Sequence, residues 1–240
     1  MMRSWRVGGR DLVERGRCRW NVVSAMVLAG LLGACAPEAE TTRETEEAAE
    51  QQPEPGQQWV LFDGKNLDHW KIIDFAGAGE VTVEEGELIL EMGEILTGIV
   101  IAGDPPLRMN YEISLEAKRV SGNDFFCGLT FPVEDVSVSF IAGGWGGGMT
   151  GISSIDGMDA SENMTSSLQK YEDDVWYRFR ARVTPGLIEA WINDRQVVNV
   201  ATEGHRLGMR FGEIEDCVPL GIATYQTTAA LRNIVIKPVE

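Results

Sequence analysis

The sequence predicts an all-β protein in which two antiparallel sheets pack as a sandwich. Short runs of β-branched and aromatic residues recur from Trp59 to the C-terminus, and turn signals such as Asp63-Gly64 and Pro185-Gly186 separate them. No stretch repeats its apolar residues with a helical period over three or more turns. About a dozen short strands at a spacing of roughly 8–12 residues are typical of a sandwich or a barrel.

Residues 1–34 are expected to be a secretion signal. Six arginines precede the apolar run 22–32, and small residues follow it, which is the order found in signal peptides. The run is shorter than the roughly 20 apolar residues that span a bilayer. Leu32-Gly33-Ala34-Cys35 resembles the bacterial lipobox, which implies a lipid on Cys35 and a membrane-anchored protein in the cell envelope, at the periplasmic face. An ordinary secretory signal and a membrane anchor are the alternatives.

The composition of residues 35–58 predicts a disordered, acidic linker. Beyond Cys35 the segment has no large apolar side chain and carries seven glutamates against one arginine, so it cannot bury a core. The whole chain has a formal net charge of −16 at pH 7. Nucleic acids and anionic membrane surfaces are therefore not expected as partners, because both require clustered Lys and Arg.

The domain is expected to begin at residue 59 and to run to residue 240. Its first strands are expected at 59–62, 81–83, 87–91, 96–102, 111–118, 124–131 and 136–142. Apolar and polar residues alternate most regularly over 111–118. A period of two places one set of side chains on each face of a strand. Tyr111, Ile113 and Leu115 are therefore expected to face the core.

The later strands are expected at 176–183, 187–192, 196–200, 218–225 and 231–237. Over 176–183 the alternation directs Phe179 and Val183 inward and Arg178 outward. Asn193-Asp194 has the form of a tight hairpin turn between two strands.

Residues 143–163 are the best candidate for a segment that contacts a ligand. They contain seven glycines, one tryptophan and three carboxylates. Glycine allows positive φ and close approach of a ligand, and Trp145 offers a flat surface for stacking. The alternative is a glycine-rich strand crossing followed by a solvated loop, with Trp145 packed in the core.

Three motifs resemble the 3-keto-disaccharide hydrolase domain family. Residues 61–70, LFDGKNLDHW, are similar to its entry motif LFDGKSLDGW. Residues 188–198 are similar to its central hairpin, and residues 230–237, ALRNIVIK, resemble its closing F-R-N-I-x-I-K. The resemblance covers about residues 59–238 and implies a concanavalin A-like jelly roll. The family's Tyr-Glu-x-Gln segment is absent, and the glycine stretch stands in its place.

The resemblance implies cleavage of a 3-keto-glycoside by hydrolysis or elimination. The proton at C2 of such a sugar is acidic, so cleavage needs a general base near C2 and a group that polarises the ketone. Asp156, Asp159 and Glu162 are the expected catalytic carboxylates, and they could also bind a divalent cation such as Ca²⁺. Lys170 and Tyr171 are alternative bases.

Four further residues are candidates for carbohydrate binding. Asn163 follows the acidic loop, while Asp124 and Gln226 lie at strand ends, where jelly-roll sites tend to form. Arg178 can contact sugar hydroxyls if its face of the sheet is the concave one; otherwise it lies on a solvated outer face.

Two questions stay open in the sequence. Cys127 and Cys217 either form a disulfide or remain two buried thiols, because the sequence does not give their separation. The function is either that of an enzyme, of a non-catalytic, lectin-like carbohydrate-binding lipoprotein, or of a structural protein of the envelope.

Overall fold

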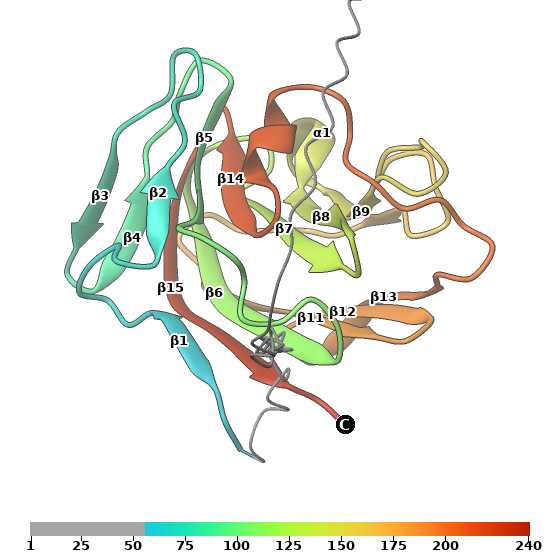
Figure 1. Cartoon of the computed structure of the whole chain (residues 1–240). Coiled ribbons are helices and arrows are strands. Elements are labelled where there is room, and N and C mark those ends of the chain that lie inside the picture. Colours follow the sequence, from blue (N-terminus) through green and yellow to red (C-terminus); the bar gives the residue numbers. More distant parts are fainter. Residues whose placement is uncertain (1–55) are drawn as a thin grey trace, which may run out of the picture. The chain divides into compact units, whose positions relative to one another are not determined.

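A computed structural model describes residues 56–240 (Figure 1). The expected signal peptide, Cys35 and most of the expected linker lie outside these residues. The described residues form two antiparallel sheets packed face to face, so the predicted all-β sandwich is confirmed. No helix in this part of the chain is long and apolar enough to cross a membrane.

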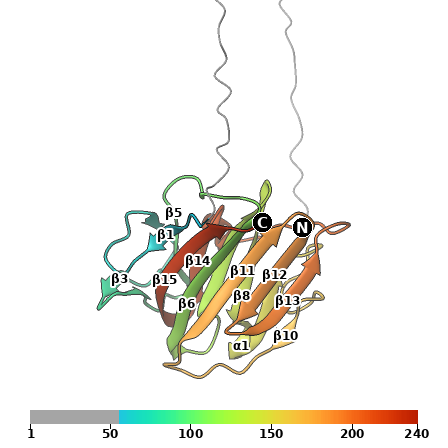
Figure 2. The ribbon, with the colours of Figure 1, turned by 90° about the horizontal axis from the view of Figure 1, so that it is seen from below.

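The first sheet, here called sheet A, has eight strands in the order β13-β12-β11-β6-β15-β4-β3, with β1 paired to β15. Its strands are β1 (Trp59–Phe62), β3 (Val81–Glu84), β4 (Glu87–Leu90), β6 (Tyr111–Gly122), β11 (Tyr177–Thr184), β12 (Leu187–Ile192), β13 (Arg195–Ala201) and β15 (Thr227–Pro238). Figure 2 shows β15, β6, β11, β12 and β13 running side by side across the outer face of this sheet.

The second sheet, sheet B, has seven strands in the order β10-β9-β8-β7-β14-β5-β2. Its strands are β2 (Trp70–Ile72), β5 (Leu96–Ile101), β7 (Cys127–Val133), β8 (Val136–Gly143), β9 (Met149–Ser153), β10 (Ser167–Leu168) and β14 (Gly221–Tyr225). Two short helical turns, α1 (Gly144–Gly147) and η1 (Glu213–Cys217), complete the described elements. The sequence did not predict β2, β9 or β10.

The core lies between the two sheets and follows the predicted alternation. Tyr111, Ile113 and Leu115 of β6 are at most 1% exposed, and Phe179 of β11 pairs with Leu115 in the sheet. The Tyr111 hydroxyl donates a 2.6 Å hydrogen bond to the carbonyl oxygen of Pro132 on β7, which ties sheet A to sheet B. This bond satisfies a polar group that would otherwise be buried without a partner.

The outer face of sheet A carries a charge cluster. Glu112 is 3% exposed and accepts hydrogen bonds from Arg180 at 3.4 Å and Arg182 at 2.9 Å, with the Lys237 amine at 3.2 Å. Burial raises the pKa of Glu112, but the hydrogen bonds from Arg182 and Lys237 outweigh it and lower the pKa overall. The guanidinium groups of both arginines also lie over the Trp191 ring.

The outer face of sheet B is partly covered by non-strand segments. Across its middle, the paired positions Gly98, Ala223 and Gly128 carry almost no side-chain volume. A second apolar cluster fills this space; it includes Phe75 from the segment after β2 and Cys217 from η1. The segment 202–217 thus lies outside the sheet, and it forms one wall of the site described below.

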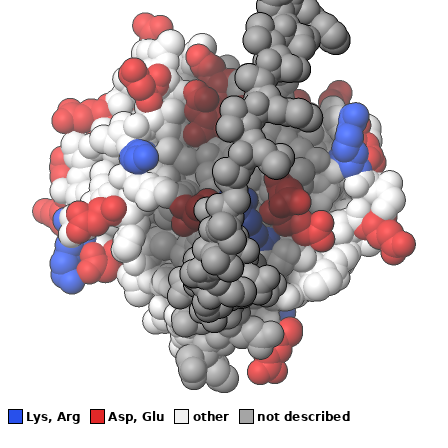
Figure 3. All heavy atoms as spheres, in the orientation of Figure 1, with Lys and Arg blue, Asp and Glu red and all other residues white. Residues whose placement is uncertain are grey.

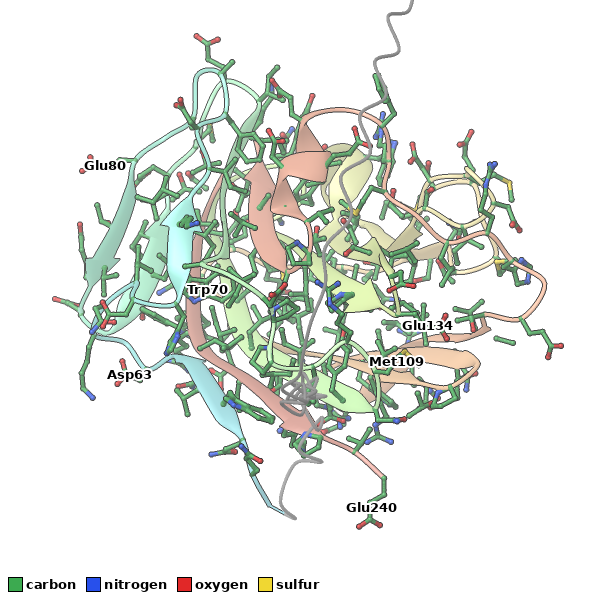
Figure 4. All side chains as sticks on the ribbon, in the orientation of Figure 1. Asp63, Trp70, Glu80, Met109, Glu134 and Glu240 are labelled. Atoms are coloured by element: carbon green, nitrogen blue, oxygen red, sulfur yellow. The ribbon has the colours of Figure 1, made fainter. Side chains whose placement is uncertain are left out.

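The acidic side chains are spread around the domain. Asp and Glu are scattered over the face shown in Figure 3, where Lys and Arg are few. In Figure 4, Glu80 and Glu240 project outward while Trp70 lies inside the outline of the ribbon. The Trp70 indole donates a 2.8 Å hydrogen bond to the carbonyl oxygen of Leu61, which fixes β2 beside β1.

Cys127 and Cys217 are both buried and are not joined by a disulfide. Cys127 belongs to the core between the sheets, whereas Cys217 belongs to the cluster on the outer face of sheet B. Burial raises the pKa of both thiols, that of Cys217 to about 12.

Candidate functional site

A groove of about 340 Å³ lies on the outer face of sheet B. Ser139 and Ile141 of β8 and Ser153 of β9 line it. Their neighbours Phe140 and Ile152 are packed in the core, so the alternation of the strands directs these three side chains away from the core and toward the groove. The volume lies within the range of about 300–1,000 Å³ that is common for ligand pockets.

The α1 turn forms one side of this groove and presents Trp145 to it. Gly143, Trp145, Gly146 and Gly147 all have positive φ, at 85°, 50°, 88° and 107°. A tryptophan in the left-handed region is strained by roughly 1–3 kcal/mol, and such strain tends to occur at functional sites. Trp145 is 44% exposed and lines the groove. The core position considered for Trp145 is therefore wrong.

Asp124 holds the α1 turn in place. One carboxylate oxygen accepts a 2.8 Å hydrogen bond from the backbone N–H of Phe125, and the other accepts a 3.0 Å bond from that of Gly146. Asp124 also lines the groove. Since both oxygens already have partners, its clearest role is to position the turn that carries Trp145.

The opposite side of the groove is formed by residues 210–214 and Tyr225. Phe211 is 92% exposed there, an unusual position for a large apolar side chain. Glu213 also lines the groove, and its carboxylate has no hydrogen bond or ion pair within residues 56–240. The groove thus combines aromatic surfaces with a carboxylate and an arginine.

Arg210 connects this wall to Trp145 and to Asp159. Its guanidinium lies 5.9 Å from the centre of the Trp145 ring and 3.4 Å from a carboxylate oxygen of Asp159. The other oxygen of Asp159 accepts a 3.1 Å hydrogen bond from the Ser153 hydroxyl. Asp159 therefore contacts two groove residues and orients Arg210.

A domain model described as 3-keto-alpha-glucoside-1,2-lyase-like matches residues 58–237. The chain belongs to this family. Similar solved structures include a putative glycosyl hydrolase from Parabacteroides distasonis ATCC 8503, with 14% identity, a TM-score of 0.50, and coverage of 76% of this chain and 94% of that chain. The Crh5 transglycosylase in complex with NAG has 12% identity, a TM-score of 0.51, and coverage of 76% and 83%. These two likenesses show the fold alone. No curated protein sequence matches.

In this lyase-like domain, Asp156 lies apart from the other predicted carboxylates. It accepts hydrogen bonds from the backbone N–H of Arg206 at 2.8 Å, and the His205 ring nitrogen lies 2.7 Å from its second oxygen. The bond to His205 is the main cause of a lowered pKa for Asp156. Asp156 thus connects the 155–158 loop to residues 205–206, which lie just before the groove wall at 210–214.

Asn163 and Glu162 are also placed differently from the prediction. Asn163 is buried, and its amide donates to the carbonyl oxygens of Ile152, Met158 and Asp159. Its oxygen accepts hydrogen bonds from Thr165. The side-chain amide of Asn163 is used inside the loop, which gives Asn163 a structural role there in place of a surface in the groove. Glu162 is exposed on the same loop.

The predicted cation site is not formed by these side chains. Within residues 56–240, no three His, Cys, Asp or Glu side chains come together in a way that could hold a metal ion. Asp156 turns to His205 and Asp159 turns to Arg210, so their carboxylates serve different partners. The set does not fit a Ca²⁺ ion, which requires six to eight oxygen ligands.

Arg178 and Gln226 lie outside the groove. Arg178 is on β11 of sheet A, the opposite sheet, where its side chain is exposed and pairs with Asp194 at 2.6 Å. Gln226 donates to the carbonyl oxygen of Glu94 and so braces the strand end next to Tyr225. Neither side chain lines the groove.

The two alternative bases are also away from the groove. Tyr171 is buried, with its hydroxyl 2.7 Å from that of Thr150, and burial raises its pKa. Lys170 is exposed and pairs with Glu172. Both residues line shallower hollows beyond the α1 turn.

The sequence analysis missed the wall at 210–214. These residues fall in a stretch without strand or helix periodicity, between two predicted strands. One signal was present: Phe211 is an isolated aromatic residue among polar residues and glycine, in the run Arg210-Phe211-Gly212-Glu213. An aromatic side chain in an aperiodic loop has no predicted core to enter, which favours a surface contact.

Proposed function

We propose that the groove binds a carbohydrate and that the protein cleaves a 3-keto-glycoside by elimination at C1 and C2. The observation that carries the proposal is the exposed Trp145 ring, held by a strained turn in a groove that also contains Arg210 and Glu213. A tryptophan face is a good platform for the apolar face of a sugar ring. Membership of the 1,2-lyase-like family supports the reaction type.

The chemistry requires a base and an electrophile, and the groove offers one of each. Of the carboxylates that line the groove, Glu213 is the one without a hydrogen-bond or ion-pair partner within residues 56–240, so it is the best candidate to take the C2 proton of the sugar. Arg210 can stabilise the negative charge that develops on the ketone oxygen, because a fixed donor favours the enolate. The electrons of the C2–H bond then form the C1=C2 bond while the glycosidic C1–O bond breaks. The departing oxygen takes up a proton, and water adds to C1 to complete hydrolysis.

In this proposal Asp159 supports the reaction through Arg210. The ion pair of 3.4 Å holds the guanidinium near Trp145. Asp156 fastens the loop from which Asp159 comes, and Glu162 remains a rival base on that loop. Replacing each carboxylate with the amide of the same size distinguishes the orientation of Arg210 by Asp159, the attachment of the loop by Asp156 and the rival base role of Glu162.

The test is turnover of a 3-keto-glucoside by the full-length protein, compared with Glu213→Gln, Glu162→Gln and the exposed control Glu203→Gln. We expect Glu213→Gln to lower kcat by a factor of about 100 or more while sugar affinity stays within about twofold. The control should match the wild type. If Glu162→Gln has the large effect instead, the base belongs to the loop and the assignment of Glu213 is wrong.

The second candidate function is carbohydrate binding without catalysis. It is favoured because both oxygens of Asp124 are already occupied by backbone N–H groups, which leaves few free carboxylates in the groove. Measurable affinity for sugars with no turnover of several 3-keto-glycosides would support it over the enzyme. Absence of both would leave a structural protein of the envelope.

The proposed location is the cell envelope, where a lipid on Cys35 would anchor the protein to a membrane at its periplasmic face. The support is the Leu32-Gly33-Ala34-Cys35 sequence after a signal-like run. Expression with radiolabelled palmitate should label the wild type but not Cys35→Ala, and the variant should leave the membrane fraction. Equal labelling of both would refute the anchor.

A further inference from the structure

The α1 turn, which forms one side of the groove, has a second hollow on its other side. A shallow hollow of about 680 Å³, here called the middle hollow, lies on the far side of the turn and is lined by Gly146, Gly147 and Gly148. Neighbours in the chain line the two spaces: Asp124 and Trp145 face the groove, while the adjacent Asn123 and Gly146 face the middle hollow. Adjacent residues are only about 3.8 Å apart between Cα atoms, so the α1 turn is a thin wall with the groove on one side and the middle hollow on the other.

A third hollow continues the line. It has a volume of about 470 Å³, is here called the distal hollow, and is lined partly by the β12–β13 turn at Asn193 and Asp194. The middle and distal hollows share Gln169, Lys170 and Tyr171. Figure 2 shows α1 and β10 at the same end of the sandwich, and residues of both elements line the middle hollow. The three spaces therefore follow one another in a line, here called the track, in which each space adjoins the next through neighbouring or shared residues.

The side chains along this track suit sugar rings. Leu168 is 77% exposed in the middle hollow and can pack under the apolar face of a ring. Gln169 lines both the middle and the distal hollow, and its side-chain oxygen accepts a 3.1 Å hydrogen bond from Arg195. Asn123 and Lys170 are exposed hydrogen-bonding groups in the middle hollow. A surface that mixes planar polar groups with isolated apolar ones matches a chain of hydroxyl-bearing rings.

Arg119 gives a second, independent indication. It is 8% exposed; its Nε donates to Asp173 at 2.6 Å and one Nη donates to the carbonyl oxygen of Tyr171 at 3.1 Å. Its other Nη is buried and has no partner among the described residues. That nitrogen lies under Gly147, 3.2 Å from where a Cβ would stand. An unpaired buried donor is costly, and a small shift of this glycine turn would let a ligand oxygen in the middle hollow satisfy it.

Trp145 lines the groove, and the next residue in the chain, Gly146, lines the middle hollow. Its strained backbone holds a flat, half-exposed ring in the side of the groove that the α1 turn forms. We propose that the groove, the middle hollow and the distal hollow bind successive units of one oligosaccharide chain. The reacting sugar would lie in the groove, and Trp145 would lie under the next linkage. This inference rests on the proposed function only for the identity of the reacting site.

The first test measures how affinity depends on chain length. The full-length protein is screened on a glycan array that carries the same sugars at several lengths. The best series is then titrated by calorimetry from the monosaccharide to the hexasaccharide, with no 3-keto group present. We expect the dissociation constant to fall by about tenfold or more along the series. Equal affinity at every length, or no binding by any member, would overturn the proposal.

The second test uses a matched pair of exposed side chains. Leu168→Ala removes an apolar contact in the middle hollow, while Met164→Ala, 57% exposed and outside all three spaces, is the control. We expect the ratio of hexasaccharide affinity to monosaccharide affinity to fall by about fivefold in Leu168→Ala. The control should keep the ratio of the wild type. An unchanged ratio in Leu168→Ala would remove the middle hollow from the binding surface.

These measurements separate the inference from the proposed function, because unoxidised sugars test binding alone. Turnover of a 3-keto-glucoside with affinity independent of length would uphold the enzyme and refute the extended track. Affinity that grows with length and no turnover would uphold the track and refute the enzyme.

Discussion

Replacing Asp124 with alanine should release the α1 turn and disturb the position of Trp145. The substitution removes the acceptors of two hydrogen bonds, at 2.8 Å from Phe125 and 3.0 Å from Gly146. A hydrogen bond to a charged group contributes about 1.5–3 kcal/mol at most. Because the Gly146 N–H is exposed and water can replace its partner, we expect a total loss of about 2 kcal/mol. For a domain of this size, that lowers Tm by about 4–8 °C.

The assay combines thermal unfolding with sugar titration and turnover. Asp124→Asn is the matched variant, since its amide oxygen keeps one acceptor and should recover about half of the lost stability. Both variants should weaken sugar binding more than they lower kcat, because Asp124 positions the turn. If Asp124→Ala unfolds at the temperature of the wild type, the turn does not depend on this carboxylate. If Asp124→Asn keeps its stability and affinity but loses turnover, Asp124 takes part in the chemistry and the positioning role is wrong.

Three further predictions concern stability and reactivity. Glu112→Gln should lower the unfolding free energy at pH 7 by about 2 kcal/mol, because it leaves three basic groups without their buried partner. Since the pKa of Glu112 is lowered in the folded state, the difference in unfolding free energy from the wild type should shrink as the pH falls below about 4. A difference that stays constant with pH would contradict the loss of an ion pair as its cause. Asp156→Asn should lower Tm at pH 7 through loss of the His205 contact, and this difference should likewise vanish toward low pH in thermal scans at several pH values. Cys127 and Cys217 should resist maleimide in the native state and react after denaturation, as mass spectrometry can show; rapid native labelling would contradict their burial.

The sandwich could be predicted because strand alternation is a local signal. In β11, and in β6 from Ile113 onward, each buried residue is followed by a more exposed one, and the register that pairs Phe179 with Leu115 follows once the apolar faces must meet. The same alternation correctly placed Arg178 on an outer face. It could not say which sheet carries the groove, because both sheets have an inner and an outer face, and only the packing of 202–217 distinguishes sheet B.

The glycine stretch shows why the site was harder to predict. The sequence marked 143–163 as one candidate segment, either a ligand contact or a strand crossing followed by a loop. In the structure its first residues form the α1 turn, the next form β9, and the rest fold around Asn163. Glycine fits both strands and turns, so composition did not separate them. The partners of the acidic residues, His205 and Arg210, come from about 50 residues later in the chain. Tertiary contacts of this kind leave no local pattern in the sequence.

The row of small residues across sheet B, Gly98, Ala223 and Gly128, limits which parts of the groove can change during evolution. A side chain on Gly128 would stand 2.9 Å from the Phe125 ring, so it would push that ring upward and change the groove from beneath. The wall at 210–214, by contrast, lies outside the strand ladders of either sheet. Its residues can change without loss of a strand hydrogen bond, so selectivity for different sugars can evolve in the wall while the floor stays constant.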